Sequence, residues 1–207
     1  MIPPFSSEFL TPAKKFRRLS VLLAIHNDPR TSQHKIGRKT HLSSSMVNNY
    51  IRAFQREGLI TVNGKTNRTQ SYHLTPSGHD QLIALLLAYS SEIIRLYGSA
   101  KREVAEKLNH LYTEGIGTVV LFGAAETAEV VHTAAKETPL KVTGVVDSDR
   151  AKQGTPFNGF LIQKPEALKQ IKADAVLITS FARQAEIRES IHRFMGKEMK
   201  VKTLSDL

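Results

Sequence analysis

Small and polar residues follow three apolar runs in the last third of the sequence, and together they could bind a ligand. The runs belong to the predicted strands over residues 117–123, 141–149 and 174–180, which we interpret as buried parallel strands. The carboxyl ends of parallel strands meet at one edge of a sheet, where open α/β folds bind their ligands. The candidate ligand-binding residues are Gly123, Ala124 and Ala125 at the first strand end, Asp147 and Asp149 at the second, and Thr179 and Ser180 at the third.

The turn after the first of these strands partly matches a dinucleotide-binding fingerprint, G-x-G-x-x-G or G-x-G-x-x-A. In GAAETA, residues 123–128, Gly123 and Ala128 match, but Ala125 replaces the glycine that lets the backbone approach a pyrophosphate. Asp147 lies 24 residues after Gly123, about where a ribose-binding carboxylate is found. The pattern predicts a nucleotide-type ligand and leaves open that Asp147 and Asp149 are only turn residues.

A second group of polar side chains could contact DNA. In residues 40–60, THLSSSMVNNYIRAFQREGLI, a helix capped by Ser43 would turn one apolar stripe inward. Its opposite face would present asparagine and arginine, which pair bidentately with adenine and guanine in the major groove. The candidate DNA-binding residues are Ser43 and Ser44 at phosphates, Ser45, Asn48, Asn49 and Arg52 on the helix, and Lys65 and Arg68 at a hairpin tip. A solvated helix surface is the alternative interpretation of the two asparagines.

The charge of the chain is concentrated beside these DNA-binding candidates. Net charge is +10, and residues 1–75 carry 12 basic and 3 acidic side chains, a net charge of +9. A local basic excess of this kind is typical of a module that binds a polyanion. The alternative is a solvated basic surface on an ordinary domain.

Composition limits the remaining function classes. The absence of cysteine excludes disulfides, cysteine nucleophiles and Cys-ligated metals. No HExxH, P-loop or G-x-S-x-G motif occurs, so we expect neither a catalytic nor a metal site. The longest mostly apolar run without charge, residues 81–91, is shorter than the ~20 residues that span a bilayer. We expect a cytoplasmic protein with no membrane contact.

The DNA-binding candidates require a winged helix in residues 1–75. Apolar spacing, caps and turn residues predict helices over residues 12–27, 31–39 and 43–57 and strands over 59–63 and 71–75, with Thr11 as the N-cap of the first helix and Pro12 in its first turn. Residues 36–60 resemble the helix-turn-helix of winged-helix repressors, and YHLTPSGHDQL (72–82) resembles the return strand and next helix of MarR-like regulators. The resemblance covers residues 12–95 and implies a regulator that binds double-stranded DNA.

Residues 76–114 predict one long helix that joins two domains. Apolar residues recur at steps of three and four, and Gly98 is the one glycine after Gly78. The predicted seam consists of Leu82, Leu86, Tyr89, Ile93, Leu96, Ala100, Val104, Leu108 and Leu111. A seam this long favours a homodimer, with a helix packed on its own two domains as the alternative.

Residues 115–207 alternate between strands and helices, which predicts a small doubly wound, Rossmann-like domain with a parallel sheet. The predicted strands are residues 117–123, 141–149, 159–163, 174–180 and 200–204, and the predicted helices are 124–137, 165–171 and 183–194. The combination of winged helix and Rossmann-like domain resembles the redox-sensing, NADH-responsive repressors. Residues 117–192 are also similar to the small Rossmann-like domains of sugar acyltransferases and nucleotide-sugar proteins, in which Arg188 would match a frequent basic residue.

These features predict a ligand-responsive transcription regulator, with NAD(H) or a nucleotide sugar as candidate ligand. One alternative is an enzyme-like nucleotide-binding or nucleotide-sugar-binding protein whose winged helix contacts other proteins. The other is a DNA-bound architectural protein whose Rossmann-like domain is an empty dimerisation module.

Overall fold

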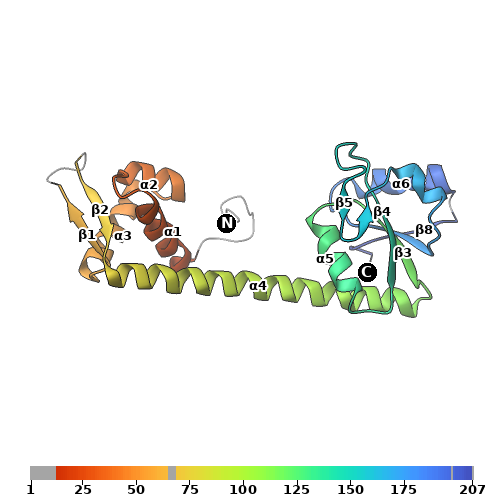
Figure 1. The fold of residues 1–207 in the computed structure, drawn as a ribbon, viewed down its shortest axis with the longest axis horizontal. Coiled ribbons are helices and arrows are strands. Elements are labelled where there is room, and N and C mark those ends of the chain that lie inside the picture. The colour runs from red at the N-terminus through yellow and green to blue at the C-terminus, as the bar shows by residue number, and fades with distance from the viewer. Residues whose placement is uncertain (1–12, 65–68, 197, 207) are drawn as a thin grey trace. The chain divides into compact units, whose positions relative to one another are not determined.

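The computed structural model describes residues 13–64, 69–196 and 198–206. The chain divides into two compact units, Met1–Ile94 and Arg95–Leu207. The first unit consists of helices and a two-stranded hairpin, and the second is built on a four-stranded parallel sheet (Figure 1). Thr11, Pro12, Lys65 and Arg68, which entered the sequence predictions, lie outside the described residues.

The first unit is a winged helix. Its elements are α1 (Lys14–Asn27), α2 (Gln33–Thr40), α3 (Ser44–Arg56), β1 (Ile60–Asn63) and β2 (Ser71–Leu74). β1 and β2 pair antiparallel, as the predicted hairpin requires. Leu22, Ile36 and Phe54, one from each helix, are fully buried in a shared core. The predicted helix-turn-helix order is therefore confirmed.

The turn between α2 and α3 is tight, and specific residues make it possible. Gly37 lies so close to the backbone that a Cβ there would be 2.6 Å from the carbonyl oxygen of Leu42. His41 adopts a left-handed conformation with φ of 54°, which ends α2. The Ser43 hydroxyl then accepts a hydrogen bond from the backbone N–H of Met46 at 3.2 Å, so Ser43 caps α3 as predicted.

The long helix α4 (Pro76–Thr113) begins against the winged helix. The Thr75 hydroxyl accepts a hydrogen bond from the Gly78 N–H at 3.0 Å and donates one to the Gly58 carbonyl at 2.7 Å. A Cβ on Gly78 would lie 2.0 Å from the carbonyl oxygen of Leu59, so only glycine permits this approach. The start of α4 is thus fixed to the first unit by the chain's own turn residues.

The apolar positions of α4 do not form the single seam that the spacing predicts. Leu82 is buried in the core of the first unit, whereas Leu108 and Leu111 are buried in the core of the second. Much of the predicted seam therefore packs on the chain itself, as the alternative interpretation proposed. The large apolar side chains that remain exposed on α4 are Ile83, Leu87, Ile94, Leu96, Tyr97 and Tyr112.

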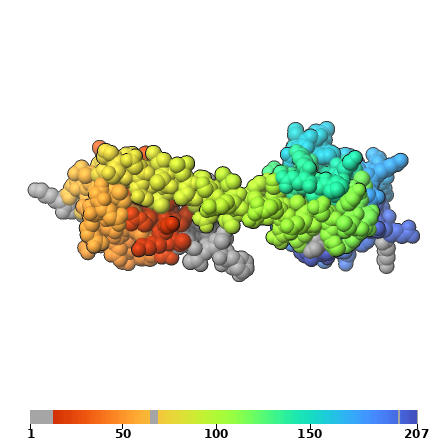
Figure 2. Space-filling view, turned by 90° about the horizontal axis from the view of Figure 1, so that it is seen from below, coloured from red at the N-terminus to blue at the C-terminus, as the bar shows by residue number. Residues whose placement is uncertain are grey.

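The same helix bears on the expectation that the protein has no contact with a membrane. A stretch of 18 residues within α4 has a mean hydropathy of 1.3, so length and composition alone would allow it to cross a bilayer. Counting only uninterrupted apolar runs missed this stretch, because isolated charged residues divide it. Only 6% of it is buried, and Figure 2 shows yellow-green surface of α4 left open in that view.

The second unit has the predicted doubly wound sheet with strand order β4-β3-β7-β8, all parallel. Its elements are β3 (Thr118–Phe122), α5 (Glu126–Ala135), β4 (Lys141–Val146), the 3-10 helix η2 (Pro165–Lys169), β7 (Ala175–Ile178), α6 (Gln184–Met195) and β8 (Lys200–Thr203). α5 and the last turns of α4 pack on one face of the sheet. η2 and α6 pack on the other face.

One predicted strand, residues 159–163, forms only in part. β6 (Phe160–Leu161) pairs with β5 (Pro156–Phe157) in a small separate hairpin, and Gln163 alone joins the edge of the sheet, through a parallel bridge to Val146. The cause is the two-residue turn between β5 and β6, because Asn158 and Gly159 both have positive φ, 47° and 93°. The predicted helix over residues 165–171 is also shorter and forms η2.

Candidate DNA-binding face and ligand pocket

α3 separates its apolar and polar side chains onto two faces. Val47, Ile51 and Phe54 are buried, with at most 3% exposed. The exposed residues are Ser44, Ser45, Asn49, Arg52, Gln55 and Arg56, whereas Asn48 is half-buried. Asn49 and Arg52 line a surface depression of about 700 Å³ together with Gln55 and Arg56. The structure therefore assembles a continuous polar face at the position where a recognition helix reads DNA.

The serines at the start of α3 serve the helix as well as the surface. Ser43 uses its hydroxyl as the N-cap, and this hydroxyl lies 2.9 Å from that of Ser45. Ser44 is exposed beside them. The cap leaves Ser43 a structural role in addition to the expected phosphate contact.

An ion pair neutralises Glu57, the acidic residue that follows α3. Arg18 of α1 binds Glu57 through both carboxylate oxygens, and its guanidinium lies 4.9 Å from the centre of the Phe54 ring. The hydrogen bond from Arg18 lowers the pKa of Glu57, so this carboxylate stays ionised and paired. Arg52 and Arg56 are thus left as charges that can act on a polyanion.

Sequence reasoning missed part of the positive surface. Gln55 and Arg56 lie one helical turn after Arg52, and their spacing could have identified them. α2 also presents a row of exposed basic side chains, namely His34, Lys35, Arg38 and Lys39. The sequence signal was the run HKIGRK in residues 34–39.

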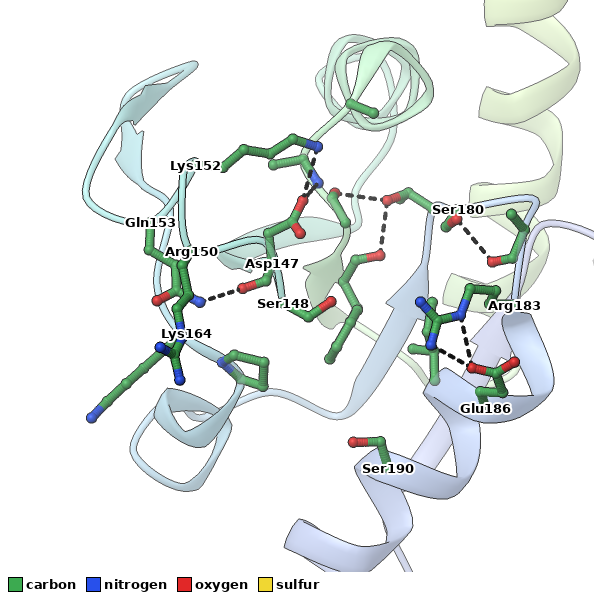
Figure 3. Close-up of a pocket in the computed structure, with 18 of the residues that line it drawn as sticks. Asp147, Ser148, Arg150, Lys152, Gln153, Lys164, Ser180, Arg183, Glu186 and Ser190 are labelled. Carbon is green, nitrogen blue, oxygen red and sulfur yellow. Dashed lines mark hydrogen bonds and ion pairs between the residues drawn. The ribbon is translucent and has the colours of Figure 1, made fainter.

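The second unit contains a pocket of about 960 Å³ at the carboxyl ends of β3, β4 and β7 (Figure 3). β3 connects through α5 to β4 on one side, and β7 connects through α6 to β8 on the other, so the pocket lies where the strand order reverses. Six of the seven predicted residues line it, namely Gly123, Ala124, Ala125, Asp147, Thr179 and Ser180. Asp149 lies outside the lining because it closes a turn, accepting a hydrogen bond from the Ala151 N–H at 2.9 Å.

Asp147 connects the two strand ends. Its carboxylate accepts hydrogen bonds from the Ala124 N–H at 2.8 Å, the Asp149 N–H at 2.9 Å and Lys152 Nζ at 3.2 Å. Burial raises the pKa of Asp147, but these three donors together outweigh burial and lower the pKa below its ordinary value. A carboxylate has about four acceptor positions, so one is left for a ligand hydroxyl.

The hydroxyls after β7 are also engaged. Thr179 is 2% exposed, and its hydroxyl lies 3.0 Å from the Phe122 carbonyl and 2.8 Å from that of Gly123. A Cβ on Gly123, which has φ of 106°, would lie only 3.0 Å from this hydroxyl. The Ser180 hydroxyl donates to the Ala182 carbonyl. Thr179 therefore holds the turn after β3 and has less to offer a ligand than its position in the sequence implied.

Replacement of Asp147 by alanine should destabilise the protein by about 1–3 kcal/mol at pH 7, because two part-buried backbone N–H groups and Lys152 lose their acceptor. A group with a lowered pKa in the folded state stabilises above its unfolded pKa, near 3.9, and this stabilisation is lost as pH falls through the folded value. The difference in Tm between wild type and Asp147→Ala should therefore shrink below about pH 4. A difference that grows in acid would contradict this assignment.

The pocket has polar and apolar walls that the sequence motifs did not reveal. Cationic side chains line it from three loops, namely Arg150, Lys152, Lys164 and Arg183. Apolar side chains line the part formed by α6 and the loop before it, namely Phe181, Ile187 and Phe194. Phe181 is 71% exposed, which is unusual for a large aromatic side chain. Arg188, by contrast, binds the Val201 carbonyl and Asp206 and supports β8.

Two family models match the chain, each over one part. A winged helix-turn-helix DNA-binding model matches residues 17–61, from α1 into β1. A model described as C2185-like, N-terminal, matches residues 116–202, from the start of the sheet into β8. No curated protein matches the chain.

Several solved structures are similar to the chain. Staphylococcus aureus MarR, in complex with salicylate and kanamycin, is 19% identical with a TM-score of 0.36; the match covers 40% of this chain and 56% of MarR, little more than half its length. MepR, a transcription regulator of the S. aureus multidrug efflux pump MepA, is 19% identical with a TM-score of 0.36, over 47% of this chain and 74% of MepR. RSP in complex with beta-NADH is 10% identical with a TM-score of 0.35, over 92% of this chain and 85% of RSP.

Proposed function

We propose that the protein is a ligand-responsive transcription regulator of the cytoplasm. The observation that carries this proposal is the presence, in one chain, of an exposed recognition helix on a strongly basic winged helix and of a pocket at the strand-order reversal of a parallel sheet. The winged helix supplies DNA binding and the pocket supplies ligand binding, and a ligand-responsive regulator requires both.

The winged helix binds double-stranded DNA with α3 in the major groove. Asn49 and Arg52 read bases, because both are exposed and both can form bidentate pairs. The basic row on α2 meets phosphates where the first helix of such a motif crosses the backbone. Lys65 and Arg68 extend the contact from the wing. The net charge of +9 in residues 1–75 makes this binding strongly salt-dependent.

The Rossmann-like domain senses a nucleotide-type molecule rather than transforming it. The volume of about 960 Å³ falls in the range of small-molecule sites. Asp147 retains one acceptor position for a ribose hydroxyl, and Phe181, Ile187 and Phe194 offer apolar surface to a planar base. NAD(H) and nucleotide sugars are the candidates to be tried first. Within the described residues, no three His, Asp or Glu side chains are grouped as metal ligands.

The regulator acts as a homodimer through the exposed stripe of α4, which we define as Ile83, Leu87, Ile94 and Tyr97. These residues follow one another at steps of 4, 7 and 3, the spacing of a coiled-coil seam, and lie within about 80° of the helix circumference. A second copy of the chain carries the same α4, so its exposed apolar residues have the same spacing and can pack against this stripe. Two copies would also present two recognition helices to two half-sites.

The central test measures DNA and ligand binding on the same sample. A thermal-shift screen with NADH, NAD, UDP-glucose and S-adenosylmethionine identifies a ligand. Its affinity is then titrated in the presence and absence of a DNA duplex selected by the protein. A regulator must show a change in ligand affinity with DNA, and an equal change in DNA affinity with ligand, expected at about 5- to 150-fold. A ligand that binds with identical affinity in both samples would show that the pocket does not control DNA binding.

A further inference from the structure

The four cations that line the pocket differ in whether they are neutralised. Lys152 pairs with Asp147 at 3.2 Å, and Arg183 pairs with Glu186 at 2.6 Å. Arg150 and Lys164 are exposed, and neither has an acidic partner within 4 Å in the described part of the chain. Figure 3 shows both on the same side of the pocket, near Gln153 and away from Arg183. Two unneutralised cations on one side create a local positive potential.

The turn after β3, where a dinucleotide fold normally holds its phosphates, is poorly suited to an anion here. The Ala124 N–H, which would face a phosphate, already donates to the Asp147 carboxylate at 2.8 Å. Ala125 adds a methyl group where glycine permits close approach, and Glu126 brings a negative charge to the first turn of α5. A phosphate at this turn would meet two carboxylates and lose one of its donors.

We propose that the anion subsite of the pocket is instead formed by Arg150 and Lys164, and that it binds the phosphate groups of a nucleotide. This inference rests on the proposed nucleotide-type ligand and specifies how it is held. Arg150 offers a planar fork that can grip a phosphate bidentately, and Lys164 adds a mobile point charge. The ribose then reaches the free acceptor of Asp147, and the base lies toward Phe181 and Ile187.

Inorganic pyrophosphate tests the subsite without assuming any nucleotide. Titrated into ¹⁵N-labelled full-length protein, it should shift the amide resonances of residues 148–153, Lys164 and Glu166. NMR separates these signals from those of α2 and α3, which also attract anions. The Arg150→Ala/Lys164→Ala double variant should bind pyrophosphate in the pocket about tenfold more weakly. Lys169→Ala/Lys172→Ala, which removes two exposed cations of the same unit that lie outside the pocket lining, should bind pyrophosphate in the pocket as wild type does.

The outcomes separate this inference from the function on which it rests. The largest shifts at Glu126 and Thr127, or undiminished pocket binding by the double variant, would overturn the subsite. With ADP and adenosine as probes, wild type should prefer ADP, whereas the double variant should bind both with similar affinity. If pyrophosphate binds as expected but ADP, UDP and NADH do not compete with it, the subsite stands and the nucleotide-sensing function is wrong.

Discussion

Replacing Asn49 and Arg52 together with alanine should weaken binding to the preferred DNA sequence roughly 10²- to 10⁴-fold. Both side chains are exposed on α3, opposite the buried Val47 and Phe54. Each can form a bidentate contact with a base edge, worth about 1–3 kcal/mol. Binding to unrelated DNA should change much less, because it depends on phosphate contacts. Fluorescence anisotropy with a selected duplex and an unrelated duplex measures both affinities.

The double variant Lys35→Ala/Lys39→Ala provides the matched comparison, since it removes two exposed charges from α2 and leaves α3 intact. It should weaken both duplexes alike and reduce the salt slope by about two, as expected for two phosphate contacts. An Asn49/Arg52 variant that loses the same affinity for both duplexes would show that α3 does not read bases. Wild-type affinity that is independent of salt would contradict DNA binding by the basic winged helix.

The winged helix could be predicted almost completely because its signals are local. Ser43 caps α3 through the backbone N–H three residues later, and Gly58, with φ of 69°, ends the helix close by. The burial of Val47, Ile51 and Phe54 follows from helical spacing alone. Interactions within one helical turn join residues three or four positions apart, so the sequence alone is enough to predict them.

The pocket was predictable in position but not in chemistry. Parallel strand ends determine the position, which is why six predicted residues line one pocket. The engagement of Asp147 depends on the Ala124 N–H, 23 residues away, and that of Thr179 depends on a carbonyl 57 residues away. Pairing of this range is decided by tertiary structure. The free cations Arg150 and Lys164 could be recognised only after the paired ones were excluded.

Tertiary packing also decides which apolar residues of the long helix α4 are exposed. α4 has apolar residues around much of its circumference, so spacing alone permits several stripes. Packing uses Leu82 in one unit and Leu108 in the other, which leaves a different stripe exposed from the one predicted. Which apolar face of a helix is available to a partner is known only when the chain's own contacts are known.

The second prediction with a large expected effect concerns the exposed stripe of α4. Leu87→Glu/Ile94→Glu should convert the protein from a dimer to a monomer of 23.1 kDa, because facing carboxylates in an apolar helix interface have no partners. Light scattering at micromolar concentration measures the change. DNA affinity should fall about 10²- to 10⁴-fold, because the two recognition helices no longer bind as a linked pair.

Ser99→Glu is the control, because residue 99 is exposed on the opposite side of α4, about 160° around the helix from Ile83. It adds one negative charge to the same helix, against two in the Leu87→Glu/Ile94→Glu variant, and should leave the dimer and its DNA affinity unchanged. A monomeric wild type would contradict the role of the stripe. Recovery of wild type in the membrane fraction, with release by the Leu87/Ile94 variant, would assign the stripe to a bilayer instead. A dimer that resists both glutamates would place the contact between copies elsewhere on the chain.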